Sequence, residues 1–112
     1  MKIAVYGSVK TNLKNKRIAH ELGQLLSNKK YELVTGAAKG INESCQKGFN
    51  GISTGFSPTK SKNDLKEFSS ISIESISKVI HTGKYLPKII QDTEEARYKF
   101  RNFLSAAYCD IA

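Results

Sequence analysis

The segment Val34–Asn42, with the sequence Val-Thr-Gly-Ala-Ala-Lys-Gly-Ile-Asn, places the end of an apolar strand, a turn and a helix start in immediate succession. Gly36 and Gly40 allow the backbone to turn sharply and to approach a ligand closely. Apolar residues recur at every fourth position from Ile41, which predicts a helix with its unpaired N–H groups and positive dipole end facing the turn. Such a turn is typical of a phosphate-binding site, although a plain strand-to-helix turn has the same form.

Strand and helix signals alternate along the rest of the chain. Strands are predicted at 3–6, 31–35, 51–58 and 78–82, and helices at 12–27, at 38–50 and in the stretch that follows residue 91. Between the third and fourth strands, an exposed excursion with a short helix near 64–68 is expected over residues 59–77. Strands joined by helices of this length imply right-handed crossovers and a parallel sheet. The predicted fold class is therefore α/β, with a doubly wound sheet.

The first and last predicted helices each have an apolar face that is expected to be buried. In the first helix this face consists of Ile18, Leu22, Leu25 and Leu26, and in the last helix it consists of Ala96, Phe100, Leu104 and Ala107. Asp92 and Glu95 have the spacing of a capping box at the start of the last helix. A fifth strand is predicted to begin at 109–112, where the sequence stops, so the sheet is expected to be incomplete and prone to self-association at that edge.

Length and composition predict a single domain over residues 1–112. No apolar run approaches the roughly 20 residues that a membrane span requires, and the apolar part of the amino terminus is too short for a signal peptide, so a cytoplasmic location is expected. The net charge is +8, from 18 Lys and Arg against 10 Asp and Glu. Because the lysines are scattered and lack interleaved aromatic residues, we expect weak, non-specific attraction to nucleic acid.

The cysteines and histidines do not form a predicted metal site. Cys45 and Cys109 lack CxxC spacing and are expected to be reduced core residues. His20 and His81 have no partner nearby in the sequence, which favours structural or surface roles. No metal and no cofactor is predicted.

Two of the three arginines, Arg97 and Arg101, lie four residues apart and therefore on one side of the last helix. Planar guanidinium groups suit phosphate and carboxylate, so both are candidate ligand-binding residues. For Arg97, a surface ion pair with Glu94 is the alternative. Arg101 is expected to lie off the apolar face of the helix, with its side chain free to reach a ligand.

Four segments resemble the LOG (Lonely Guy) family of the SLOG nucleotide-binding superfamily. Residues 3–8, Ile-Ala-Val-Tyr-Gly-Ser, resemble the first strand and Gly-Ser turn of the family, and residues 33–41 are similar to its phosphate loop. Residues 52–58 resemble its third strand, and residues 101–110 resemble its stretch from an arginine to an Ala-Asp pair. The four matches occur in order and cover most of the chain.

This resemblance implies a Rossmann-like domain that binds nucleoside 5′-monophosphates or related phosphates. In the LOG branch, such domains hydrolyse the N-glycosidic bond and release a free base and ribose 5-phosphate. The phosphate or ribose would be held by Gly36, Ala37, Ala38 and Gly40. Gly7 and Ser8 would border the base pocket, and Arg101 would be the arginine of the catalytic site. The resemblance also suggests a homodimer formed through helices near the site.

Two departures from the family keep the function open. Ala37 and Ala38 stand where LOG enzymes usually have glycines, and the family's Pro-Gly-Gly-x-Gly-Thr turn and catalytic glutamate would follow residue 112. One reading is thus a nucleotide-phosphate-binding domain of LOG phosphoribohydrolase type whose catalytic motif lies outside this chain. The alternatives are a non-catalytic SLOG domain that senses a nucleotide or holds single-stranded DNA in the manner of DprA, and an α/β domain without a ligand.

Overall fold

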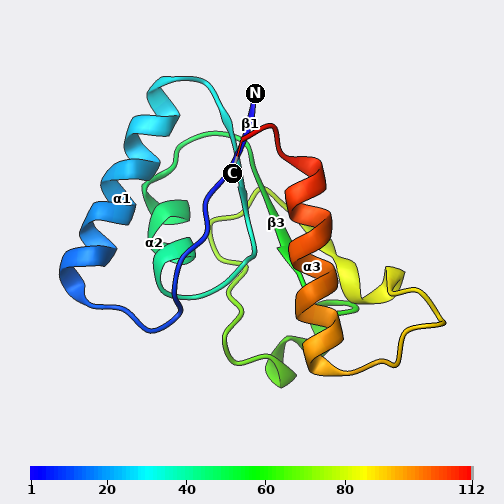
Figure 1. The fold of residues 1–112 in the computed structure, drawn as a ribbon. Coiled ribbons are helices and arrows are strands. Elements are labelled where there is room, and N and C mark those ends of the chain that lie inside the picture. The colour runs from blue at the N-terminus through cyan, green and yellow to red at the C-terminus, as the bar shows by residue number, and fades with distance from the viewer. Residues whose placement is uncertain (112) are drawn as a thin grey trace.

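The computed structural model describes residues 1–111 and builds them around one parallel sheet with the strand order β1-β2-β3-β4 (Figure 1). The strands are β1 (Lys2–Ala4), β2 (Glu32–Thr35), β3 (Ser53–Ser57) and β4 (Lys78–His81). The helices are α1 (Leu13–Asn28), α2 (Ile41–Gly48) and α3 (Glu94–Tyr108), with the 3₁₀ turns η1 (Lys62–Glu67) and η2 (Thr82–Tyr85). The predicted α/β class and the order of its elements are confirmed.

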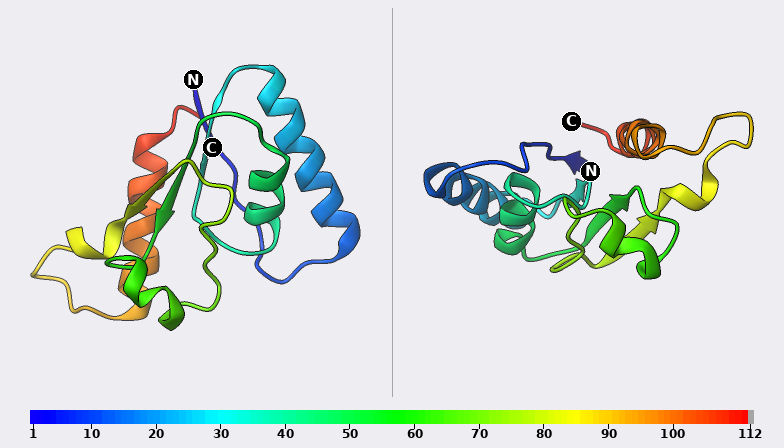
Figure 2. Two further views of the ribbon diagram at one scale, coloured as in Figure 1. Left: turned by 180° about the vertical axis from the view of Figure 1, so that it is seen from behind. Right: turned by 90° about the horizontal axis from the view of Figure 1, so that it is seen from below.

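Helices cover both faces of this sheet. Leu33 of β2 packs with Ala19 and Cys45, which belong to α1 and α2. The next residue, Val34, points to the opposite face and belongs to a cluster that includes Leu104 of α3. Figure 2 shows α1 and α2 together, with α3 set apart from them across the sheet. The sheet is therefore doubly wound, as predicted.

A fifth parallel segment begins beside β1. Ile111 forms a parallel bridge with Ile3, and the Ala4 amide donates to the Ile111 carbonyl at 2.7 Å. The chain thus turns back after β4 and returns through α3 to the other side of β1. The predicted start of a fifth strand is confirmed at Ile111, while Ala112 lies outside the described residues. In open α/β sheets, the carboxyl ends of the strands flanking such a reversal are the usual place for a ligand.

The starts of the long helices are set by polar side chains. Asn12 caps α1 by accepting from the Asn15 amide at 2.8 Å, so the helix predicted over 12–27 begins one residue later. At α3, the predicted capping role of Asp92 is wrong. Thr93 is the cap and accepts from the Ala96 amide at 3.1 Å, because the carboxylate of Asp92 is used by an arginine.

The predicted buried face of α1 is only partly correct. Ile18, Leu22 and Leu25 are 55%, 40% and 62% exposed, and only Leu26 of the predicted face is partly buried. The buried residues of this helix are Ala19 and Gly23. The reason is the close approach of α2, since a Cβ on Gly23 would collide with the Cys45 carbonyl oxygen. Small residues therefore determine which side of α1 is buried.

The buried side of α3 also differs from the prediction. Ala107 is exposed, and Ser105 is the fully buried residue of the helix. Arg101 is half-buried on the side that faces the sheet, which corrects the expectation that it lies off the packed face. A polar residue can face the sheet here because the strand ends below it offer hydrogen-bond partners.

The excursion after β3 folds back over the turn that follows β2. It contains the short helix expected near 64–68, observed as η1. Ile71 forms an antiparallel bridge with Ala38, and Phe68 and Ile71 pack against Ala37. Among the described residues, no helix is both long and apolar enough to cross a membrane.

Candidate functional site

A pocket of about 240 Å³ opens at the carboxyl ends of β1 and β2, and β1 is one of the two strands that flank the reversal. The turns after these strands supply one wall, and α2 and α3 supply the rest. It is lined by Tyr6, Gly7, Val9, Gly36, Ala38, Asn42, Arg101 and Asn102. Four of the predicted site residues, Gly7, Gly36, Ala38 and Arg101, are thus brought together in one place.

The centre of the pocket is the contact between Arg101 and Gly36. Arg101 Nη1 donates to the Gly36 carbonyl oxygen at 2.5 Å. A Cβ on Gly36 would lie 2.8 Å from Nη1 and 3.1 Å from Cζ, so any side chain there would displace the guanidinium. Gly36, which was predicted to contact phosphate or ribose, therefore also leaves space for the guanidinium of Arg101.

The charge of Arg101 is not neutralised by a carboxylate among residues 1–111. Its Nε donates to Asn102 Oδ1 at 2.7 Å, and its Cζ lies 5.2 Å from the centre of the Tyr98 ring. Burial lowers the pKa of this guanidinium, while Tyr98 and Tyr6 oppose that effect. Arginine keeps its proton at any physiological pH. The pocket thus holds a desolvated positive charge.

The amino terminus of α2 borders the same pocket. Its first residues have no side-chain cap within the described chain, and Gly40, the residue before the helix, has a φ of +77°. A Cβ on Gly40 would collide with the carbonyl oxygens of Ser8 and Val9. The Ile41 amide donates to the Ser8 carbonyl at 3.1 Å. Gly40 and Ser8 therefore join the two turns through their backbones and do not themselves line the pocket.

Ala37 lies beside the pocket but faces away from it. It is completely buried against Phe68 and Ile71, and its carbonyl accepts from the Ser72 amide at 2.7 Å. Its φ is +55°, in the left-handed region that favours glycine. The phosphate loop that this turn resembles usually has glycine here. In this chain an alanine adopts the left-handed conformation, and its methyl group is packed in the core.

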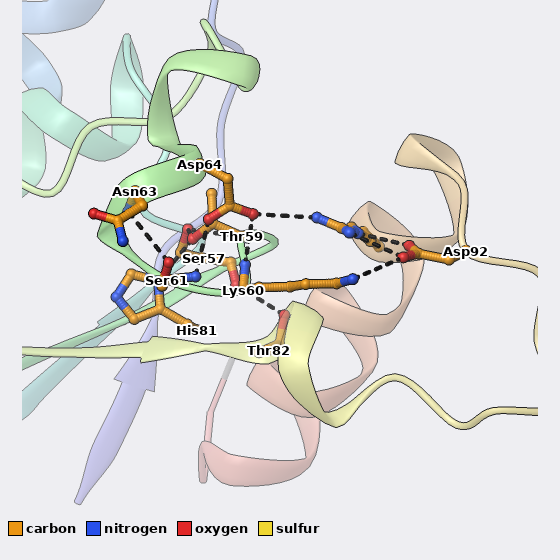
Figure 3. Close-up of polar contacts among 10 residues, drawn as sticks. Ser57, Thr59, Lys60, Ser61, Asn63, Asp64, His81, Thr82 and Asp92 are labelled. Carbon is orange, nitrogen blue, oxygen red and sulfur yellow. Dashed lines mark hydrogen bonds and ion pairs between the residues drawn. The ribbon is translucent and has the colours of Figure 1, made fainter.

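Arg97 lies outside this pocket. Its Nε and Nη2 donate to the two carboxylate oxygens of Asp92 at 2.7 and 2.9 Å, and its Nη1 is 3.3 Å from Asp64 Oδ2. Figure 3 labels the two carboxylates, Asp64 and Asp92. The alternative pairing of Arg97 with Glu94 is not made among the described residues. The charge of Arg97 is neutralised by the bidentate pairing with Asp92 and by Asp64. Arg97 is therefore not available to a ligand in the pocket of Arg101.

A second polar cluster surrounds the ends of β3 and β4. The buried hydroxyls of Ser57 and Thr59 are 2.6 Å apart, and Thr59 Oγ1 is 2.7 Å from His81 Nδ1 (Figure 3). Burial lowers the pKa of His81, and the lysines nearby act in the same direction while Asp64 opposes them. The contacts are satisfied within the cluster, which fits the structural role expected for His81.

A larger hollow of about 580 Å³ runs along residues 83–92 and includes Lys60, Lys84 and Lys88. All three lysines are exposed, and Lys60 is already paired with Asp92 at 3.2 Å. Exposed, solvated lysines hold an anion weakly. Within residues 1–111, no group of three His, Cys, Asp or Glu side chains is placed to hold a metal ion.

A family model matches residues 1–110 of this chain and is described as the SLOG cluster4 family. The chain belongs to that family. The predicted resemblance to the SLOG superfamily is confirmed by this match. No curated protein gives a significant match.

One solved structure that is similar to this chain is the molybdenum cofactor carrier protein MCP from Chlamydomonas reinhardtii. It is 26% identical with a TM-score of 0.59, and the match covers 78% of this chain and 52% of that one. The second is TM1055, a structural genomics target, at 20% identity and a TM-score of 0.65, with 98% of this chain and 56% of that one covered. The SLOG cluster4 chain therefore spans about half the length of both.

Four residues of the pocket in this SLOG cluster4 domain were not predicted, namely Tyr6, Val9, Asn42 and Asn102. Tyr6 ends the first strand signal, and its hydroxyl is 3.0 Å from Ser105 Oγ. Asn102 follows the arginine directly, and Asn42 is a polar residue at the second position of a helix that follows a glycine turn. The position of Asn42 in the first turn of an uncapped helix was the feature of the sequence that could have predicted its place in the pocket.

Proposed function

We propose that this SLOG domain binds a phosphorylated small molecule of the nucleoside monophosphate class, with the phosphate on Arg101. The observation that carries the proposal is that Arg101 is half-buried in the pocket and has no carboxylate partner among residues 1–111. A desolvated guanidinium that makes only neutral hydrogen bonds gains most from a bound anion.

The surroundings of Arg101 suit a phosphate. Nη1 and Nε are engaged by Gly36 and Asn102, and among the described residues no protein group accepts from Nη2. Gly36 keeps the wall beside the guanidinium free of side-chain atoms, and the uncapped start of α2 adds the positive end of a helix dipole. A planar donor group and a helix terminus at one pocket favour a phosphate over a neutral ligand.

The described pocket supports binding more than hydrolysis. N-glycosidic hydrolysis generally uses carboxylates as acid and base, and none of the lining residues within 1–111 is Asp or Glu. The similarity to a molybdenum cofactor carrier protein supports a binding role on this fold, since that protein is named for carrying its ligand. Release of a free base from a nucleotide, as in the LOG branch, therefore stays a less favoured candidate.

Calorimetric titration with AMP and with adenosine tests the proposal. We expect AMP to bind and adenosine to bind at least tenfold more weakly, because a charge-assisted contact to phosphate contributes about 1.5–3 kcal/mol. Arg101→Ala should lose a similar factor for AMP and nothing for adenosine. Arg17→Ala removes the same charge from the exposed surface of α1 and is the matched control. Equal AMP affinity in the wild type and Arg101→Ala would refute the proposed site.

A further inference from the structure

The side chain of Asn42 has an unused acceptor at the pocket. Asn42 is 3% exposed, lines the pocket and lies in the first turn of α2. Its Oδ1 is buried and accepts no hydrogen bond from any described residue. Burying an amide oxygen without a donor is unfavourable, so such a group points to a ligand that supplies one.

The orientation of this amide is fixed by its other end. Asn42 Nδ2 is 3.1 Å from the Gly7 carbonyl oxygen, which can only accept. Rotating the amide by 180° would set two acceptor oxygens against each other, so Nδ2 must face Gly7 and Oδ1 must remain the free atom. The ligand must therefore present a donor to Asn42, whereas Arg101 on the same pocket requires an acceptor.

The size of the pocket indicates which part of a nucleotide lies at Asn42. A volume of about 240 Å³ is below the roughly 300–1,000 Å³ of pockets that enclose a drug-sized ligand. Tyr6 and Val9, at 44% and 42% exposed, are apolar surfaces open to solvent and suit the face of a base. The enclosed part then accommodates the sugar and phosphate, and the donors of a sugar are its hydroxyl groups.

We infer that Asn42 Oδ1 accepts a hydrogen bond from the 2′- or 3′-hydroxyl of the bound ligand's ribose and thereby distinguishes the ligand from the analogue that lacks this hydroxyl. This inference rests on the proposed function. It assigns a specificity role to a residue that the phosphate contact at Arg101 does not use. It also separates the ligand from single-stranded DNA, whose sugars lack the 2′-hydroxyl and use the 3′-oxygen in the backbone.

The test combines a deletion on the ligand with a deletion on the protein. AMP, 2′-deoxy-AMP and 3′-deoxy-AMP are titrated by calorimetry into the wild type, Asn42→Ala and Asn102→Ala. We expect at least one deoxy analogue to bind the wild type about fivefold more weakly than AMP, which is the effect of one neutral hydrogen bond. The ratio of the affinity for AMP to the affinity for that deoxy analogue should fall to about one in Asn42→Ala, because this variant lacks the acceptor.

Asn102→Ala is the matched control, because it removes a pocket amide whose Oδ1 already accepts from Arg101. Its affinity for AMP should fall while the ratio of AMP to deoxy analogue stays as in the wild type. If Asn42→Ala fails to fold, equal binding of the three ligands to the wild type still overturns the inference.

Three results would overturn the inference, and they differ in what they say of the proposed function. Equal binding of all three ligands, with AMP still dependent on Arg101, removes only the role of Asn42. A ratio that persists in Asn42→Ala assigns the hydroxyl to another residue. No binding of AMP to the wild type overturns the proposed function together with this inference.

Discussion

Arg101 of α3 lies directly against the backbone of Gly36 at the end of β2, with 2.5 Å between Nη1 and the glycine carbonyl oxygen. The guanidinium occupies the space that a Cβ would need, so the two residues form one unit. A turn that looks like a generic phosphate loop in the sequence is thus completed by an arginine from the opposite face of the sheet.

Gly36→Ala should therefore weaken ligand binding through Arg101. The added Cβ would lie 2.8 Å from Nη1, and the flexible end of the arginine will move before the strand does. We expect about tenfold weaker AMP binding, since the charge-assisted contact is misplaced, and a loss in the free energy of unfolding of about 1 kcal/mol. Calorimetry and urea unfolding measure the two quantities.

Gly51→Ala is the control for this substitution, because Gly51 is exposed and its Cβ would meet only the Phe49 ring, far from the pocket. It should leave AMP affinity unchanged. Unchanged affinity in Gly36→Ala would show that Arg101 does not need its present position.

Ala37→Gly should be close to neutral for stability. The left-handed φ of +55° destabilises an L-residue by about 1 kcal/mol, and glycine removes this strain. The substitution also removes one buried methyl group, whose burial stabilises the fold by a similar amount. Ala38→Gly is the matched comparison, because Ala38 is also buried but has no positive φ, and it should lose about 1 kcal/mol. Equal losses in urea unfolding of both variants would contradict the strain argument.

The sequence was sufficient for the order of elements and for half of the pocket. Periodicity and glycine turns placed β2, α2 and the start of the fifth strand correctly, because these depend on local patterns. The orientation of α3 was missed, since Arg101 faces the sheet only because the Gly36 carbonyl is there to accept from it. Arg97 donates to Asp92, which is five residues before it in the sequence, and to Asp64, which is 33 residues away, and only the pairing with Asp64 leaves no local signal.

Stability should fall in acid through Asp64. Partial burial alone would raise the pKa of this carboxyl, but hydrogen bonds from the Lys60 and Ser61 amides, together with Arg97, lower it below its ordinary value of 3.8. A folded-state pKa below the unfolded one contributes stability that is present above about pH 4 and lost as the pH falls further. Asp64→Asn should lose about 1 kcal/mol at pH 7, because Asp64 is the third helical residue of a capping box whose cap is Ser61, and asparagine offers one acceptor oxygen to two amides.

The difference between the wild type and Asp64→Asn should shrink when urea unfolding is repeated at pH 3. Glu21→Gln, which removes an exposed carboxylate from α1, should not show this pattern. A constant difference between pH 7 and pH 3 would mean that the Asp64 contacts do not depend on its charge.

Cys45 should resist alkylation in the folded protein. It is completely buried, and burial raises the pKa of its thiol from the ordinary 9.0 to about 11, which lowers the thiolate fraction about a hundredfold. Cys109 is only half-buried and should react first with iodoacetamide. Mass spectrometry of the labelled protein, with the denatured chain as reference, measures the labelling of each cysteine. Rapid labelling of Cys45 would show that the core between α1, α2 and β2 opens readily.

Single-stranded DNA should bind weakly and without base preference. The net charge of +8 attracts polyanions, and such binding falls steeply as salt rises because it depends on released counterions. Fluorescence anisotropy between 50 and 200 mM salt measures this, and Arg101→Ala should change it no more than Arg17→Ala. Submicromolar affinity at physiological salt would favour the DNA-binding alternative.

The contact between Gly36 and Arg101 joins positions 65 residues apart, across a chain that must first pair four strands and then cross to the other face of the sheet. Closing a loop of this length carries an entropic cost that contacts between near neighbours in the sequence avoid. The ligand site is therefore complete only in molecules whose last helix is docked on the sheet. A ligand held there binds this docked state alone, and so it raises the stability of the docked state against opening of α3.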